Sequence, residues 1–402
     1  MIIRARTIVT MDGPPIVNGA IAVCGNQIVD AGNFDEIKAR HTGELIDLGE
    51  QTLLPGLINA HCHLDYTCLR SKIPPQKSFS DWIRAINAEK AKLSSDDYIA
   101  SINEGLAEAK RFGTTTIANL TAFPELIPQI HAPIRTWWFA ELIDVREPER
   151  ANELVDRASE SLGRARRPGT PWGLAPHALF TASQDLYRRA QEIASGDNIL
   201  LTTHLAESRE EMQMFRNASG PLYEFLRHIG RPMQDCGDKT PLGLFLGATG
   251  GQALPRWIIV HLNELAESDF ELLERSDSKF HIVHCPRSHD YFGHSAFAFE
   301  RLRALGFNIC LGTDSLASND DLSLFAEMRA FQKAFPTISS EAILRMVTAN
   351  PATALYQENA PGRIRSGLKA DLIAVPCSGL ADVFEQIIAF DGSVSWAMVN
   401  GE

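Results

Sequence analysis

Eight short apolar segments alternate with helical patterns through the middle of this chain, and this alternation restricts the possible folds more than any other feature. The apolar segments lie at 53–60, 114–120, 134–143, 172–176, 199–203, 257–260, 280–283 and 308–313. Such runs are typical of parallel strands that are buried on both faces. Strict alternation over eight units predicts an α/β fold of the (β/α)8 TIM barrel type. A doubly wound sheet is the alternative, but no Gly-x-Gly-x-x-Gly pattern follows the first segment.

Both ends of the chain contain short strand-like runs separated by turns. Residues 2–10, 20–32 and 44–56 carry them at the N-terminal end, and residues 363–376 and 394–402 at the C-terminal end. Because chain termini often lie close together, we expect both ends to form one small β-sandwich domain, residues 1–55 plus 357–402. Residues 56–356 would then form the barrel. Two unrelated terminal meanders are the alternative.

Charge and cysteine content limit the partners and the compartment. A formal net charge of -12 leaves no basic footprint, so neither nucleic acid nor an anionic membrane surface is expected as a partner. The seven cysteines are scattered without a CxxC pair, which favours reduced thiols in a cytoplasm. No apolar run reaches the roughly 18 residues of a membrane span. We therefore expect a cytoplasmic protein that acts on a small molecule.

Residues that bind metal ions or protons follow six of the eight apolar segments, at the ends where a barrel places its active site. His61 and His63 are two residues apart, so their side chains lie on the same face of a strand. On spacing alone, chance explains this pair as well as a metal site does. The other five segments end in His177, His204, His261, His284 and Asp314. This repetition favours a metal site over chance.

A catalytic zinc ion takes histidine nitrogen and carboxylate oxygen and keeps a position open for water. The candidate ligands are His61, His63, His204 and Asp314. Such an ion lowers the pKa of its water toward about 7 and creates a nucleophile. Glu207 follows His204 by three residues, close enough to exchange protons with water and substrate. Taken alone, Asp314 fits a turn and Glu207 fits a solvated helix start; together with the histidines they indicate a catalytic site.

The segments that contain these residues resemble the motifs of the amidohydrolase superfamily. They are PGLINAHCHLD, APHALFTAS, THLAES, VHLNE, HCPRSH and GTDSLASNDDLSLFAEMR, with VTANPATAL and GRIRSGLKADLIAV near the C-terminal end. The chain is similar to the cytosine-deaminase-like and chlorohydrolase-like branch, above all to deaminases of S-adenosylhomocysteine, methylthioadenosine and aminofutalosine. The resemblance implies that hydroxide formed at a metal ion attacks the amino-bearing carbon of a purine nucleoside or related heterocycle and releases ammonia.

The resemblance also implies a role for each residue. One divalent ion, Zn or in some relatives Fe, would be held by the four ligands His61, His63, His204 and Asp314. Asp314 would take the first proton from water, Glu207 would deliver a proton to the ring nitrogen, and His261 would orient the attacking hydroxide. His177 would contact the substrate. Trp82 would lie in a lid over the pocket, although a buried core position is an equal alternative for this residue.

Departures from the family pattern leave some contacts open. Binuclear members carry a lysine on the fourth strand, and its absence from WGLAPHAL favours a single ion. His289 stands where relatives commonly have Asn, and both His284 and His289 are equally compatible with the pocket and with a structural loop. Glu141 or Arg146 occupies the region where some adenosine-type deaminases have an arginine. A homodimer is implied by resemblance only.

Two other functions remain open on the sequence. The same metal site would also serve a related amidohydrolase that acts on guanine-like bases, cyclic amidines or chlorotriazines. A non-catalytic barrel homologue is the alternative from another class. The intact ligand set and Glu207 argue against the non-catalytic alternative.

Overall fold

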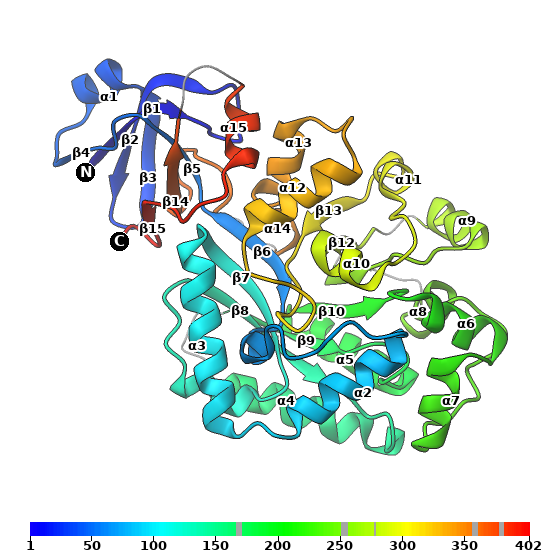
Figure 1. Ribbon diagram of the computed structural model, residues 1–402. Helices are drawn as coiled ribbons and strands as arrows, with labels where there is room; N and C mark the ends of the chain where they lie inside the picture. The colour runs from blue at the N-terminus through cyan, green and yellow to red at the C-terminus, as the bar shows by residue number, and fades with distance from the viewer. Residues whose placement is uncertain (166–170, 251–255, 277–278, 356–360, 378–381) are drawn as a thin grey trace.

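A computed structural model of the chain describes residues 1–165, 171–250, 256–276, 279–355, 361–377 and 382–402. Two separate sheets organise these residues (Figure 1). The larger sheet holds eight parallel strands: β6 (Leu57–Cys62), β7 (Thr114–Thr121), β8 (Arg135–Leu142), β9 (Trp172–Pro176), β10 (Leu200–Leu205), β11 (Trp257–His261), β12 (His281–His284) and β13 (Asn308–Leu311). Each strand pairs with its neighbours in chain order.

The two end strands of this sheet, β6 and β13, approach each other and nearly close it into a barrel. An isolated parallel bridge joins Cys62 to Asp314, and the backbone N–H of Thr313 donates to the carbonyl of His61 at 3.0 Å. Apolar side chains such as Ile58, Phe139 and Ile258 fill one buried cluster drawn from the strands. The TIM barrel predicted from the eight apolar segments is therefore confirmed.

Helices pack around the barrel and follow most of its strands (Figure 1). Those outside the terminal sheet are α2 (Phe79–Lys90), α3 (Ser95–Arg111), α4 (Ala151–Ala165), α5 (Gln184–Asp197), α6 (Arg209–Asn217), α7 (Pro221–His228), α8 (Pro241–Ala248), α9 (Glu267–Arg275), α10 (Pro286–Phe292), α11 (Phe299–Ala304), α12 (Leu324–Ala334), α13 (Ser340–Arg345) and α14 (Ala349–Ala354). Short 3-10 turns are η1 (Leu64–Leu69), η2 (Pro124–Gln129) and η3 (Pro148–Arg150).

Helix α3 illustrates why these segments are helical. Ser94 and Asp97 form a reciprocal capping box at its start, which satisfies two backbone N–H groups that the helix leaves unpaired. Ile102 and Leu106 recur at four-residue spacing and are fully buried. Lys110 and Arg111 occupy the last turn, where the helix dipole favours positive charge.

Strands from both ends of the chain form the second sheet. Its seven strands are β1 (Ile2–Ile8), β2 (Ile16–Cys24), β3 (Gln27–Asn33), β4 (Leu45–Asp47), β5 (Gln51–Pro55), β14 (Leu372–Pro376) and β15 (Trp396–Met398). Helix α1 (Phe34–Arg40) packs on β2 and β3, whereas α15 (Val383–Ala389) packs against α12 and α13. Strand β14 pairs antiparallel with β5, so the blue N-terminal and red C-terminal strands lie side by side in Figure 1. The expected boundary between residues 356 and 357 lies outside the described residues.

The first apolar segment, residues 53–60, is not the single strand that its sequence predicts. It is divided between β5 in the terminal sheet and β6 in the barrel. Gly56 lies at the junction, where a Cβ atom would clash with the Thr115 side chain. The Gly56 N–H donates to Asp371 and the next N–H, of Leu57, donates to Gly113, so the backbone changes partners within one residue.

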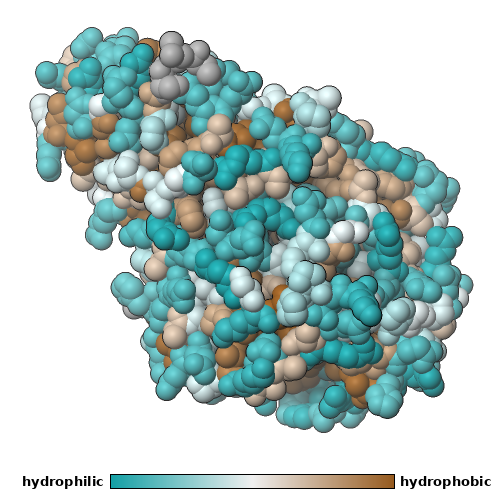
Figure 2. All heavy atoms as spheres, in the orientation of Figure 1, coloured by the Kyte–Doolittle hydropathy of each residue, from teal (hydrophilic) through white to brown (hydrophobic). Residues whose placement is uncertain are grey.

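Among the described residues, no helix is long and apolar enough to cross a membrane. Figure 2 shows one face of the molecule, on which hydrophilic and hydrophobic side chains are interspersed.

Candidate active site

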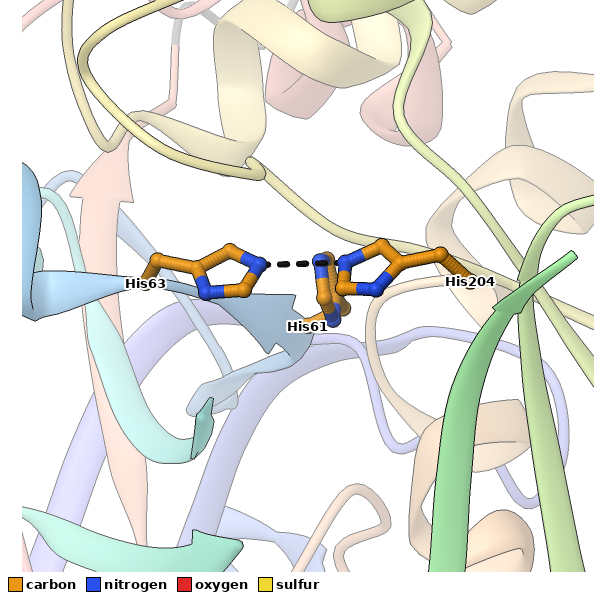
Figure 3. A group of neighbouring side chains, drawn as sticks. All are labelled: His61, His63 and His204. Carbon is orange, nitrogen blue, oxygen red and sulfur yellow. Dashed lines mark hydrogen bonds between the residues drawn. The ribbon is translucent and has the colours of Figure 1, made fainter. Parts of the chain in front are cut away.

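Three histidine side chains meet at the carboxyl ends of β6 and β10. Nε2 of His63 lies 3.1 Å from Nε2 of His204, and the His61 ring lies edge-on to both, with centroid distances of 4.9 and 5.0 Å. One ring nitrogen from each residue lies within 4.8 Å of the others. Figure 3 shows the nitrogens of His63 and His204 facing each other, with the His61 ring edge-on beside them. The His-x-His pair of the sequence therefore meets its expected third partner.

The chemistry of this cluster fits a bound cation. Both ring nitrogens of His61 are buried without a hydrogen-bond partner among the described residues, which is costly unless a ligand pairs with them. Burial and the neighbouring imidazoles lower the pKa of His63 well below its usual value and that of His204 to about 4. Neutral imidazoles present free lone pairs, and three buried nitrogen donors suit a divalent transition metal.

Asp314 lies beside this cluster, as its sequence position after the eighth strand predicts. Its Oδ1 is 3.7 Å from Nε2 of His61 and 3.9 Å from Nε2 of His63, while its Oδ2 accepts a hydrogen bond from Ser288 Oγ at 2.6 Å. Burial opposes ionisation of Asp314, but His61, His261 and His63 outweigh it and hold its pKa well below the usual value. Asp314 is therefore an anion next to the three imidazoles.

The backbone around Asp314 is tightly constrained. Asp314 has φ +56°, a left-handed conformation that is uncommon for a residue with a side chain. Two residues earlier, a Cβ atom on Gly312 would lie 2.8 Å from the His61 carbonyl oxygen, so only glycine fits there. Close approach of these two strand ends places the carboxylate beside His61. Local strain of this kind concentrates at functional sites.

Glu207 and His261 form a second buried pair facing the same cavity. Glu207 Oε1 lies 3.6 Å from Nε2 of His261. The backbone N–H of Glu207 donates to Glu211 Oε2 at 2.7 Å, and Asn263 Nδ2 donates to the Glu207 carbonyl at 3.1 Å. Burial, with Asp314 and Glu211 nearby, raises the pKa of Glu207 well above its usual value. Burial likewise lowers the pKa of His261 well below normal, so the surroundings favour the protonated form of Glu207 and the neutral form of His261.

His177 supports the cluster and also borders the cavity. Its backbone carbonyl accepts a hydrogen bond from Nδ1 of His204 at 2.8 Å, which leaves Nε2 of His204 unprotonated and facing His63. Its own Nδ1 lies 2.6 Å from Thr181 Oγ1, and its Nε2 is 3.9 Å from Glu141. The backbone carbonyl of His177 therefore orients His204, while the His177 side chain is available to a ligand.

A cavity of about 320 Å³ opens beside these groups. Its lining includes His63, Glu141, Arg146, His177, His204, Glu207, His261 and Asp314, together with Trp82 and other residues of α2 and α7. His284 and His289 are not among the described lining residues: the ring of His284 stacks on Phe297 at 4.1 Å, and Nδ1 of His289 lies 3.1 Å from Asn263 Oδ1.

Helix α2 forms one wall of the cavity and is held at its start by a glutamate from α6. The Glu210 carboxylate accepts hydrogen bonds from the backbone N–H of Phe79 at 2.9 Å and of Ser80 at 3.2 Å. Trp82 follows one turn later, stacked near Phe79 and edge-on to Phe292 with a centroid distance of 5.0 Å. The wall that carries Trp82 is thus anchored three residues from Glu207.

Several supporting residues were not singled out from the sequence. Ser288 and Asn263 lie inside the HCPRSH and VHLNE motifs, so their position beside His284 and His261 was the available signal. Glu210 and Glu211 follow Ser208 in a pattern typical of a helix start. That pattern predicts a cap but says nothing about the cavity wall or about the Glu207 backbone.

Comparison with known proteins supports one family over nearly the whole chain. The model of the amidohydrolase family matches residues 52–402. The chain belongs to the amidohydrolase family. It is accordingly an enzyme, a hydrolase that acts on carbon–nitrogen bonds other than peptide bonds.

Relatives within the amidohydrolase family are named as deaminases. The aminodeoxyfutalosine deaminase of Deinococcus radiodurans is 27% identical over 342 residues, which cover 81% of this chain and 79% of the relative. The 5-methylthioadenosine/S-adenosylhomocysteine deaminase of Pyrococcus furiosus is 27% identical over 388 residues, covering 93% and 86%.

Solved structures share the fold of this amidohydrolase. Aminofutalosine deaminase of Helicobacter pylori in complex with methylthio-coformycin superimposes with a TM-score of 0.88 at 21% identity, covering 100% of this chain and 98% of that one. A zinc-bound adenosine deaminase of Xanthomonas campestris gives a TM-score of 0.84 at 23% identity, covering 100% and 92%. At these identities the likeness concerns the fold.

Proposed function

We propose that this amidohydrolase is a metal-dependent deaminase that hydrolyses the exocyclic amino group of an adenine-containing nucleoside. The observation that carries the proposal is that two buried carboxyl groups, Asp314 beside the three histidines and Glu207 beside His261, line one cavity. Their surroundings shift the two pKa values in opposite directions, down for Asp314 and up for Glu207. Two carboxyl groups whose pKa values are driven apart supply a base and an acid at the same pH.

The ligands of the proposed ion are His61, His63, His204 and Asp314, and the ion is Zn, with Fe as the alternative. A divalent ion bound there supplies Lewis-acid activation of water at neutral pH. Nε2 of His63 and His204 already face each other, and Asp314 Oδ1 lies within 3.9 Å of His61 and His63. Three nitrogens and one oxygen form the donor set of a single-ion catalytic site.

The protons of the reaction balance between Asp314 and Glu207. Asp314 accepts one proton from the attacking water while Glu207 protonates the ring nitrogen next to the amino-bearing carbon, and the carbon–oxygen bond forms. Glu207 then recovers a proton from the new hydroxyl group, and Asp314 passes its proton to the amino group. The carbon–nitrogen bond breaks and ammonia leaves. His261, 3.6 Å from Glu207, orients the attacking oxygen.

The cavity suits a flat heteroaromatic base with an attached group. Its volume of about 320 Å³ lies at the small end of the range for drug-sized ligands. Aromatic side chains border it at Trp82, Phe180 and Phe225 and can pack on a purine face. We assign Trp82 and His177 to substrate contact. The relatives that are named as nucleoside deaminases support this substrate class.

A substrate panel tests the proposal. Purified protein loaded with Zn should release ammonia from at least one of adenosine, methylthioadenosine, S-adenosylhomocysteine and aminodeoxyfutalosine, with a fall in adenine absorbance. Guanine, a cyclic amidine and a chlorotriazine belong in the same panel as competing substrates. Turnover confined to those competitors would refute the nucleoside assignment and leave the family intact.

A further inference from the structure

Glu141 presents a buried carboxylate to the cavity without a hydrogen bond of its own. It lies near the end of β8, and its side chain is 6% exposed. Oε1 is 3.9 Å from Nδ1 of His63 and 3.9 Å from Nε2 of His177, both too long for hydrogen bonds. Among the described residues, none forms a hydrogen bond with this carboxylate. A carboxylate left this way is costly unless a ligand donates to it.

The His63 ring separates Glu141 from the site of the proposed ion. Nε2 of His63 faces His204 at 3.1 Å, whereas Nδ1, on another edge of the same ring, faces Glu141. The imidazole ring therefore stands between Glu141 and the proposed ion. Glu141 is placed to meet a part of the substrate away from the reacting carbon.

A neutral hydrogen-bond donor suits the surroundings of Glu141 better than a cation does. Lys90 of α2 lines the same cavity, with its Nζ 4.6 Å from the Tyr66 ring, so a positive charge is already present in the cavity lining. The carboxylate has acceptor atoms only, when ionised. Hydroxyl groups are donors that bring no charge, and two neighbouring hydroxyls match the two carboxylate oxygens.

We propose that Glu141 accepts hydrogen bonds from the sugar hydroxyl groups of the substrate and thereby selects a nucleoside over a free base. This inference rests on the proposed nucleoside deaminase function and names the residue that reads the sugar. Hydrogen bonds to a charged group contribute enough to change kcat/KM by about 10- to 100-fold. Glu141 is thus a specificity residue, and proton transfer stays with Glu207 and Asp314.

A comparison of two substrates in two proteins tests this role. Adenosine and its dideoxy analogue, which lacks both neighbouring sugar hydroxyls, are compared in the wild type and in Glu141→Ala. We expect the wild type to favour adenosine by about 10- to 100-fold in kcat/KM, and the variant to treat both alike within about threefold. Glu141→Gln, which keeps one acceptor oxygen and the volume, should fall between them.

Metal content and equilibrium binding separate the competing outcomes. If Glu141 merely orients His63, Glu141→Ala loses bound Zn and both nucleosides slow equally, which overturns the assignment. A preference for adenosine that persists in a folded Glu141→Ala or Glu141→Gln protein also overturns it.

If the wild type deaminates neither nucleoside, calorimetry compares the binding of the two ligands. Tighter binding of adenosine that is abolished in Glu141→Ala supports the role of Glu141 even though the proposed reaction fails. Equal or absent binding of the two ligands overturns the role as well.

Discussion

Replacing Glu207 with glutamine removes the proposed proton donor and leaves the rest of the site in place. The backbone N–H that donates to Glu211 and the carbonyl that accepts from Asn263 do not depend on the side chain. Because burial raises the pKa of Glu207 and favours its neutral form, Glu207→Gln replaces that form by another neutral group of similar shape. We therefore expect the free energy of unfolding to change by less than about 1 kcal/mol.

The catalytic loss should be much larger than the stability change. General acid–base catalysis contributes about 10²- to 10⁴-fold, or about 3–5 kcal/mol of activation free energy. Glu207 does not belong to the three-histidine cluster, so bound Zn should stay stoichiometric. Steady-state ammonia release gives kcat, and metal analysis gives the ion content of the same sample. Glu271→Gln on the exposed face of α9 is the matched control and should be unchanged.

A Glu207→Gln protein that keeps kcat within about threefold of the wild type would refute the proton-donor role. Loss of the bound ion together with activity would also count against the proton-donor role, since it would place Glu207 in the metal site rather than in proton transfer.

Three further predictions concern residues other than Glu207. His204→Ala should lose bound Zn and lower the melting temperature measured with Zn present, because a ligand set lacking one imidazole binds the ion weakly; unchanged metal content would contradict the ligand role. Glu210→Ala removes the hydrogen bonds to Phe79 and Ser80 and should raise KM more than it lowers kcat, with Glu224→Ala on α7 as the control. Burial raises the pKa of Glu327 from 4.5 to about 8, so the folded state binds its proton more tightly and stability falls as pH rises between these values. Glu327→Gln should flatten that fall in denaturant titrations, and an unchanged slope would count against it.

The barrel and its three-histidine cluster were predictable because their signals are local. Each apolar strand is recognisable from its own residues, and a barrel gathers all strand ends at one face. His61, His63 and His204 therefore had to converge once the strand assignment was right. Asp314 was expected beside them for the same reason, and its carboxylate lies within 3.9 Å of two of these rings.

Residues that act across elements were not predictable in this way. Glu210 sits on α6 but anchors α2, more than a hundred residues earlier in the chain. The sequence placed Glu141 only on the third strand. Its significance depends on the gaps of 3.9 Å that separate its carboxylate from His63 and His177, and these appear only in the structure. The division of residues 53–60 between two sheets was also hidden, since an apolar run carries no mark of the partner that each half pairs with.

If water activated at this site replaces an amino group on a nucleoside ring, the oxygen of that water must appear in the product. The most direct test is mass spectrometry of the product formed by the Zn-loaded enzyme in oxygen-labelled water. We expect one labelled oxygen at the ring carbon that bore the amino group, with one ammonia released per product. A product that retains its amino group, or a label at any other carbon, would contradict this mechanism.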